Sequence, residues 1–270
     1  MLKIAILAVV TTVIALITPA SADQSLWKST EGHEWVLDLP FENGLTQRVL
    51  YLAPARPRAT LIMLPGGAGK VGMQRDGDLR HDDNFVVRTR QDWVARDYAV
   101  LIPDTIAQEN LRGARSSPGY GKLISDLVAY AHSHVPAPVF LIGTSQGTIA
   151  AMNGAARARP KSISGVVLTE SVSLPGRRSA ETVFDANPSD VRVPALVVAN
   201  RDDACNVAPP EMAPRIVAAM THAPSARVLT VTGGLKQSAK ACGSLSPHGY
   251  YGIESQVVNS IASWLREQGG

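Results

Sequence analysis

The chain has 270 residues, which is enough for one large α/β domain or two small ones. Its 45% hydrophobic content is normal for a globular protein with a sizeable core. The net charge is only +3 and the basic residues are scattered rather than clustered, so the sequence carries no footprint of nucleic-acid binding.

The first residues predict a signal peptide. Lys3 precedes an apolar run at 4–17, and "TPASA" follows with Ala20 and Ala22 in the A-x-A arrangement that signal peptidase accepts. The run is shorter than the roughly 20 residues that a membrane-spanning helix needs. We therefore expect cleavage after Ala22, a periplasmic or secreted mature protein of residues 23–270, and no stable membrane anchor.

The mature chain alternates β-rich apolar runs with helical patterns. Strands are predicted at 33–40, 47–53, 59–65, 99–103, 138–143, 163–170, 194–200 and 226–233, and helices at about 85–97, 119–134, 146–158, 209–220 and 251–267. The first two strands alternate apolar and polar residues, as an antiparallel edge pair would, whereas the later runs of Val, Ile and Leu suit strands covered on both faces. Ser117 with Pro118 predicts a helix start, and Pro160 a helix stop. The pattern predicts one α/β domain with a mostly parallel sheet of about eight strands and helices on both faces.

Ser145 follows the fifth predicted strand, where sites in parallel sheets are usually found. It lies in "GTSQG", a G-x-S-x-G pattern between a predicted strand and a predicted helix. Gly143 and Gly147 are small where a sharp turn brings the strand and the helix together. The pattern predicts a nucleophilic serine on a strained turn.

A glycine-rich turn at 66–69 follows the third predicted strand, at the same end of the sheet. A backbone N–H there, of Gly67 or Ala68, is a candidate to bind a developing oxyanion together with the N–H of Gln146. The alternative is a phosphate-binding loop, which needs Ser or Thr after its lysine, whereas Lys70 precedes a valine.

An acid that could orient a catalytic histidine follows the seventh predicted strand. Asp202 and Asp203 both stand there, and we favour Asp203. Glu170, at the end of the preceding strand, is a further candidate. One of the two aspartates must be an ordinary solvated loop residue.

His248 is the candidate base, because it lies in a long polar loop just before the final helix. The resulting chain order Ser145, Asp203, His248 is a stronger signal than the residue types alone. His132 and His134 stand two residues apart on a predicted helix, point in different directions and cannot chelate a metal together. The loop at 75–83 is a candidate rim of the substrate mouth or hard-cation site, but it lacks calcium-loop spacing, so a solvated loop is expected.

These motifs resemble the α/β-hydrolase fold, and more narrowly its small dienelactone-hydrolase-type and esterase-type members. The resemblance covers about 33–268 and rests on "LPGGAG", "GTSQG", "NRDDAC" and "SPHGYYGIESQVVNSIASWL". It implies that Ser145 is the nucleophile, His248 the base and acid, and Asp203 the orienting acid. It also implies an oxyanion hole formed by the backbone N–H groups of Gln146 and Gly67, with no cofactor and no metal.

Two features depart from the wider family. Pro65-Gly66 stands where a His-Gly pair usually precedes the oxyanion loop. The segment at 171–193 is short, so we expect no large helical lid over the site.

Cys205 and Cys242 are the only cysteines, and in an oxidising compartment such a pair usually forms a disulfide. The alternative is two buried free thiols; a metal site lacks a second pair of suitably spaced ligands. The disulfide would connect the loop of Asp203 to the loop of His248, and we hypothesise that it holds the two side chains in register.

The leading functional prediction is an exported serine hydrolase that cleaves a carboxylic ester of a small-molecule acyl substrate. A thioester, lactone or amide hydrolase with the same triad is an alternative, because pocket shape rather than the triad selects the bond. A non-catalytic binding protein of the same fold is a third interpretation. Loop arginines would favour an anionic substrate, although a solvated surface is the default expectation for them: Arg112, Arg115, Arg177 and Arg178.

Overall fold

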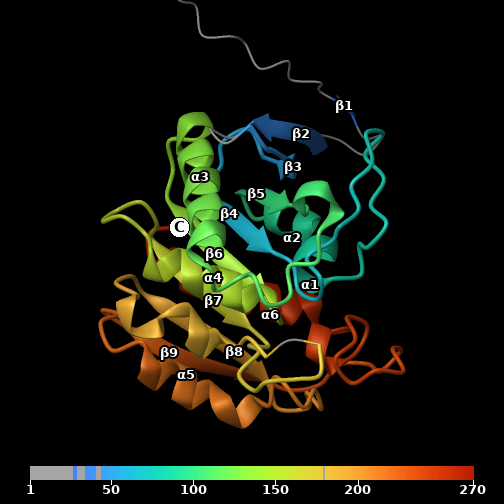
Figure 1. Cartoon of the computed structure of the whole chain (residues 1–270), viewed down its shortest axis with the longest axis vertical. Coiled ribbons are helices and arrows are strands. Elements are labelled where there is room, and N and C mark those ends of the chain that lie inside the picture. Colours follow the sequence, from blue (N-terminus) through green and yellow to red (C-terminus); the bar gives the residue numbers. More distant parts are fainter. Residues whose placement is uncertain (1–26, 29–33, 41–43, 179) are drawn as a thin grey trace, which may run out of the picture.

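A computed structural model describes residues 27–28, 34–40, 44–178 and 180–270. The predicted signal peptide lies outside these residues. In the described ranges every helix is too short or too polar to cross a bilayer. These residues fold around one twisted sheet of nine strands (Figure 1).

The strand order across the sheet is β1-β2-β3-β5-β4-β6-β7-β8-β9. The bounds are β1 Trp27–Lys28, β2 Glu34–Pro40, β3 Thr46–Leu52, β4 Ala59–Leu64, β5 Tyr98–Pro103, β6 Val139–Thr144, β7 Gly165–Thr169, β8 Ala195–Asn200 and β9 Ala226–Val231. The pairings β1–β2, β2–β3 and β3–β5 are antiparallel. Every pairing further along the order, from β5 to β9, is parallel. The eight predicted strands and the mostly parallel sheet are confirmed; the two-residue β1 was not predicted.

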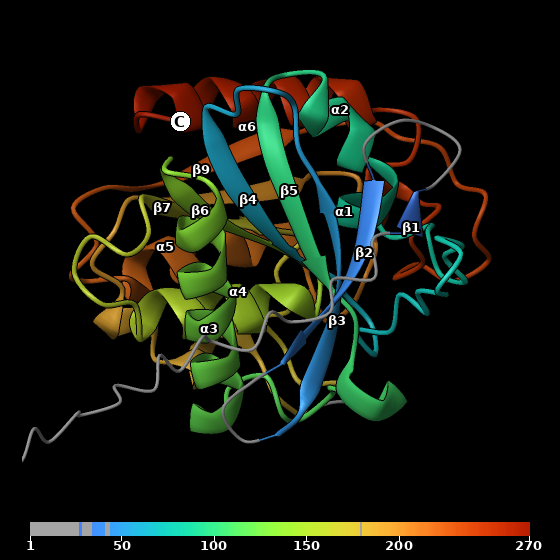
Figure 2. The ribbon, with the colours of Figure 1, turned by 90° about the horizontal axis from the view of Figure 1, so that it is seen from above.

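Helices cover both faces of the sheet (Figure 2). Their bounds are α1 Phe85–Arg88, α2 Arg90–Val94, α3 Pro118–His134, α4 Gly147–Ala156, α5 Ala213–Ala219 and α6 Glu254–Glu267. Buried residues of α3, α4 and α5 share one hydrophobic core with one face of the sheet. Residues of α1, α2 and α6 form a second core on the other face. The predicted three-layer arrangement is therefore confirmed.

Local sequence explains most helix boundaries. Ser117 caps α3 by accepting a hydrogen bond from the Tyr120 N–H at 3.2 Å, and Pro118 occupies the first turn, where its missing N–H costs nothing. The helix predicted at 85–97 is interrupted at Thr89. Its hydroxyl donates to the Phe85 carbonyl at 2.7 Å, a local bond that competes with regular helix geometry.

One burial prediction is wrong. β9 was expected to be covered on both faces, but most of its residues are half-buried or exposed. It is the edge strand of the sheet, with β8 as its only strand neighbour in the described fold. A hydrophobic run alone does not distinguish an edge strand from a central one.

The central strands position the functional candidates. β4, β6, β7 and β8 run parallel, so the segments that follow them all leave the sheet at one edge. The Leu64–Gly143 and Thr144–Thr169 pairings place the glycine-rich turn, Ser145 and Glu170 next to one another at that edge.

Candidate active site

Ser145 stands on a sharp turn between β6 and α4. Its φ of +52° lies in the left-handed region, which is unusual for a residue with a side chain. The turn is held by the Ser145 N–H, which donates to the Thr169 carbonyl at 2.9 Å, and by the Thr148 hydroxyl, which donates to the Ser145 carbonyl at 2.6 Å. The strain presents the hydroxyl above the sheet edge.

The glycines on either side of this turn are required by close backbone approach. A Cβ on Gly147 would lie 2.0 Å from the Leu64 carbonyl oxygen, and one on Gly143 would lie 2.3 Å from the Gly147 carbonyl oxygen. Neither space admits a side chain. The packing explains why this serine is flanked by glycine on both sides.

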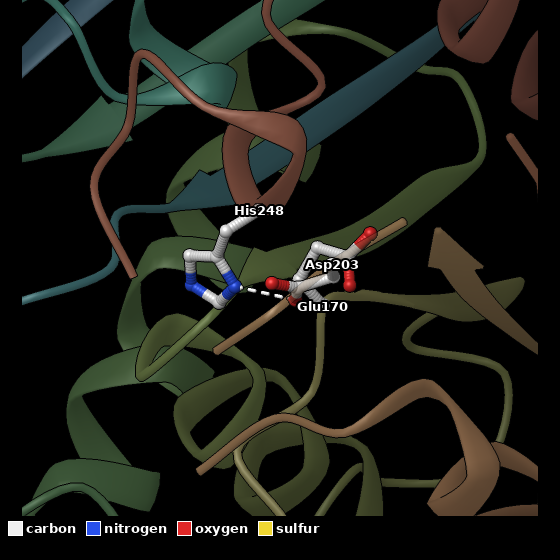
Figure 3. A group of neighbouring side chains, drawn as sticks. All are labelled: Glu170, Asp203 and His248. Atoms are coloured by element: carbon white, nitrogen blue, oxygen red, sulfur yellow. Dashed lines mark hydrogen bonds and ion pairs between the residues drawn. The ribbon is translucent and has the colours of Figure 1, made fainter. Parts of the chain in front are cut away.

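His248 joins Ser145 to Asp203. Its Nε2 lies 2.9 Å from the Ser145 Oγ, and its Nδ1 lies 2.7 Å from the Asp203 Oδ2. The histidine side chain is 4% exposed and the carboxylate is 0% exposed. Figure 3 draws the contact between His248 and Asp203 with Glu170 beside it. The structure thus brings together three side chains that are 45 to 103 residues apart in the sequence.

The structure distinguishes between the two aspartates. Asp203 is buried, and its second oxygen accepts the Cys205 N–H at 2.8 Å. Asp202 is exposed and accepts the Gly233 N–H at 2.6 Å, which closes the loop after β9. The ring of His248 therefore contacts the favoured aspartate, and its neighbour has a structural hydrogen bond elsewhere.

Glu170, the further candidate acid, is buried behind this pair. Its Oε1 accepts the Asn200 N–H at 2.8 Å rather than a bond from the imidazole. Burial raises the pKa of Glu170 well above its usual value, and the negative charge of Asp203 raises it further. Both effects favour the protonated, neutral form of the Glu170 side chain over its carboxylate form.

Glu170, Asp203 and His248 together have the composition of a metal-ligand set, since one possible ligand atom from each lies within 4.8 Å of the others. Two ligands about 2.1 Å from a tetrahedral zinc ion stand about 3.4 Å apart. The 2.7 Å contact from His248 to Asp203 is shorter than that and is a charge-assisted hydrogen bond. The geometry fits a histidine–carboxylate pair better than a metal site.

The backbone N–H groups of Gln146, Gly67 and Ala68, residues that line the cavities at Ser145, have no acceptor in the described part of the chain. A Cβ on Gly66 would stand 3.0 Å from the Ser145 Cβ, so the glycine-rich turn packs directly against the serine. Gly67 has a φ of +58°, which glycine adopts without strain. Unoccupied donors on both sides of a hydroxyl are the arrangement that an oxyanion requires.

Arg115 holds this turn in place, which the sequence did not reveal. A solvated surface was the default expectation for it, but the side chain is 1% exposed. Its guanidinium donates to the Gly67 carbonyl at 3.1 Å and to the Pro65 carbonyl at 3.2 Å. Burial lowers its pKa, and nearby Tyr120 and Glu181 act in the opposite direction. No local pattern marks an arginine as buried when its acceptors are backbone carbonyls about fifty residues away.

The loop of His248 is fastened at several points. The predicted disulfide between Cys205 and Cys242 is present, which confirms that expectation. Ser246 accepts the His248 N–H at 3.2 Å and donates to the Gly243 carbonyl at 2.7 Å. Asn200 donates to the carbonyls of Gly233 and Pro247, so one buried amide links the end of β8 to the histidine loop. The sequence analysis did not single out Asn200.

Two cavities meet at Ser145. The first, of about 410 Å³, also contains Gln146, Arg112, Arg177 and Arg178. The second, of about 380 Å³, contains His248 and reaches the loop at 75–83 through His81. Of the described residues between β7 and β8, only Val183–Ala186 and Pro188–Asp190 are helical, as two short 3-10 turns, so the expected absence of a large lid is confirmed there. A larger cavity of about 640 Å³ lies between β3 and α3 and does not include Ser145.

No protein-family model matches the chain, and no curated protein matches it. Several solved structures match the chain in fold. A dienelactone hydrolase from Anabaena variabilis is 17% identical, with a TM-score of 0.56 over 87% of this chain and 97% of that one. An esterase from Pyrococcus furiosus is 13% identical, with a TM-score of 0.61 over 88% and 92%. A carboxyl esterase from Bacillus coagulans is 12% identical, with a TM-score of 0.60 over 88% and 99%. The chain therefore has the α/β-hydrolase fold.

Proposed function

We propose that this protein is an exported serine hydrolase that cleaves carboxylic esters through an acyl-enzyme. One observation carries the proposal: a strained serine at the junction of two cavities, 2.9 Å from a buried imidazole whose other nitrogen is 2.7 Å from a buried carboxylate. That is the arrangement by which a hydroxyl becomes a nucleophile.

In the acylation step, His248 accepts the Ser145 proton on Nε2 as Oγ attacks the ester carbonyl. Asp203 accepts a hydrogen bond from the Nδ1–H group of His248 and stabilises the imidazolium that forms. The negative charge that develops on the carbonyl oxygen is stabilised by the N–H groups of Gln146 and Gly67. The tetrahedral intermediate collapses when His248 passes its proton to the departing alcohol, which leaves the acyl group on Ser145.

In the deacylation step, water replaces the alcohol beside His248. The imidazole takes a proton from the water, the resulting hydroxide attacks the acyl carbonyl, and the proton returns to Ser145 as the carboxylic acid leaves. Every atom in this cycle comes from the ester, from water or from the three side chains, so the cycle requires no cofactor.

The test is labelling and turnover in matched serine variants. We expect the purified protein to hydrolyse p-nitrophenyl butyrate and to gain one fluorophosphonate adduct on Ser145, detected by intact-mass spectrometry. Ser145→Ala should lose both signals. The control is Ser260→Ala, a half-buried serine on α6 whose hydroxyl donates to the Gln256 carbonyl, and it should retain both. Ester turnover that survives Ser145→Ala would refute the assignment.

Export is part of the proposal. It is supported by the disulfide and by the A-x-A pattern before residue 23. The mass of the protein recovered from an exporting bacterial host should correspond to a chain that begins at Asp23. A full-length chain retained in the cytoplasm would contradict it.

A further inference from the structure

The first of the two cavities at Ser145 is lined by positive charge. Arg112, Arg177, Arg178 and Lys240 all contribute to its wall, from three separate loops. Among the described residues of that wall none is acidic. One sign of charge in a concave site raises the local concentration of ligands of the opposite sign.

Within the described part of the chain, these cations have no counter-ion. Arg48, Arg88 and Arg90 each contact a carboxylate, whereas none of the four cavity cations forms an ion pair with a described residue. Arg112 is half-buried, and its pKa is lowered first by burial and then by repulsion from Arg178. Like charges held together at a cavity wall are stabilised when an anion occupies the cavity.

Arg112 also brings this charge close to the reacting atoms. Its Nη2 lies 3.5 Å from the point that a Cβ on Gly67 would occupy. Gly67 is one of the two proposed oxyanion donors. The guanidinium of Arg112 therefore lies next to a residue that would contact the ester carbonyl.

The position of His248 assigns the two cavities to the two halves of an ester. The departing alcohol must lie beside Nε2, because it takes its proton from there. His248 lines the second cavity and not the first. The alcohol half therefore occupies the second cavity, and the acyl half extends into the cationic one.

We propose that the preferred substrates are esters whose acyl half carries a carboxylate, as in half-esters of short dicarboxylic acids. The cavity volume of about 410 Å³ suits a small molecule of this kind. Guanidinium groups bind carboxylates through paired, charge-assisted hydrogen bonds, which explains the use of arginine at three of the four positions. The inference rests on the proposed ester hydrolysis.

The experiment compares three esters: monobenzyl glutarate, benzyl pentanoate and 4-carboxybenzyl pentanoate. They place the carboxylate on the acyl half, nowhere, or on the alcohol half. We expect kcat/KM for monobenzyl glutarate to exceed that for benzyl pentanoate by about tenfold or more, in line with the gain from one charged hydrogen-bonded pair. The preference should fall as salt is raised, because both arginines at 177 and 178 are exposed.

Variants identify the residues responsible. Arg177→Gln combined with Arg178→Gln should reduce the preference for monobenzyl glutarate about tenfold, mainly through KM. Arg192→Gln removes an exposed arginine that precedes β8 at the opposite sheet edge, and it should leave the preference unchanged.

The outcomes separate the two proposals. If benzyl pentanoate is hydrolysed as well as monobenzyl glutarate, the anionic-substrate inference is wrong and the hydrolase proposal stands. If 4-carboxybenzyl pentanoate is preferred, the assignment of the acyl half to the cationic cavity is wrong. If only p-nitrophenyl butyrate is hydrolysed, the anionic-substrate inference is wrong and the hydrolase proposal stands. If that ester is not hydrolysed either, the ester-hydrolase proposal fails and the inference fails with it.

Discussion

Removing the disulfide tests whether it positions the catalytic groups or only stabilises the fold. Cys205 follows Asp203 by two residues, and its N–H donates to the Asp203 Oδ1 at 2.8 Å. Cys242 directly precedes Gly243, whose carbonyl accepts a hydrogen bond from the Ser246 hydroxyl, and the same hydroxyl accepts the His248 N–H. The link thus joins the backbone beside the acid to the turn that holds the base. We expect its removal to affect both stability and turnover.

The stability effect follows from the loop that the link closes. The two cysteines are 37 residues apart, and closing a loop of that length removes about 4 kcal/mol of chain entropy from the unfolded state. For a protein of this size, 1 kcal/mol corresponds to about 2–4 °C in Tm. Cys205→Ser combined with Cys242→Ser should therefore lower Tm by about 8–16 °C.

The turnover effect is measured about 15 °C below the variant's own Tm, where the variant is still fully folded. This margin is several times the Tm change of about 2–4 °C that corresponds to 1 kcal/mol of stability. We expect kcat to fall about tenfold or more with little change in KM, because a misplaced base slows proton transfer without removing substrate contacts. Differential scanning calorimetry and steady-state ester hydrolysis give the two quantities.

A matched control separates positioning from stability. Ile261 is fully buried in α6, on the face of the sheet away from α4, and Ile261→Ala should cost about 2–5 kcal/mol. This variant should be destabilised to a similar degree while keeping its kcat. A double cysteine variant that is folded and retains the wild-type kcat would refute the positioning role.

Three further predictions concern single residues. Because burial raises the pKa of Glu170, the folded state keeps a proton that the unfolded chain loses above about pH 4.5, so this residue destabilises the fold increasingly as pH rises from there toward the folded pKa. Glu170→Gln should flatten the pH dependence of urea-measured stability above pH 4.5, by about 1.4 kcal/mol for each pKa unit removed, and an unchanged slope would contradict the prediction. Asp203→Asn should lower kcat about 10³- to 10⁴-fold, while Asp202→Asn should change it by less than about threefold; the reverse order in a kinetic assay would exchange their roles. Gly147→Ala places a Cβ 2.0 Å from a backbone oxygen that cannot move aside, so it should lower Tm by at least about 10 °C, and a wild-type melting curve would show that the turn adjusts.

Local sequence was sufficient for the elements and for the position of the serine. Runs of Val, Ile and Leu predicted the central strands, and Ser117-Pro118 predicted the start of α3, because those properties depend on a few neighbouring residues. The "GTSQG" pattern was readable for the same reason, since a sharp strand-to-helix turn requires small residues at fixed offsets from the serine.

Long-range packing decided the remainder. The sequence favoured Asp203 over Asp202, but the distinction rests on which carboxylate contacts a histidine 45 residues away. The exposure of β9, the structural role of Arg115 and the link through Asn200 also depend on neighbours that only the folded sheet supplies.

The sequence by itself thus determined the order of the elements, the strained serine turn and the pair of cysteines, because each is encoded in residue types at short spacing. The tertiary structure decided which groups contact His248, which donors beside Ser145 are unoccupied and which loop arginines share a cavity with it. Those properties arise where loops from different strands meet, and the relative positions of such loops are set by the packing of the whole sheet.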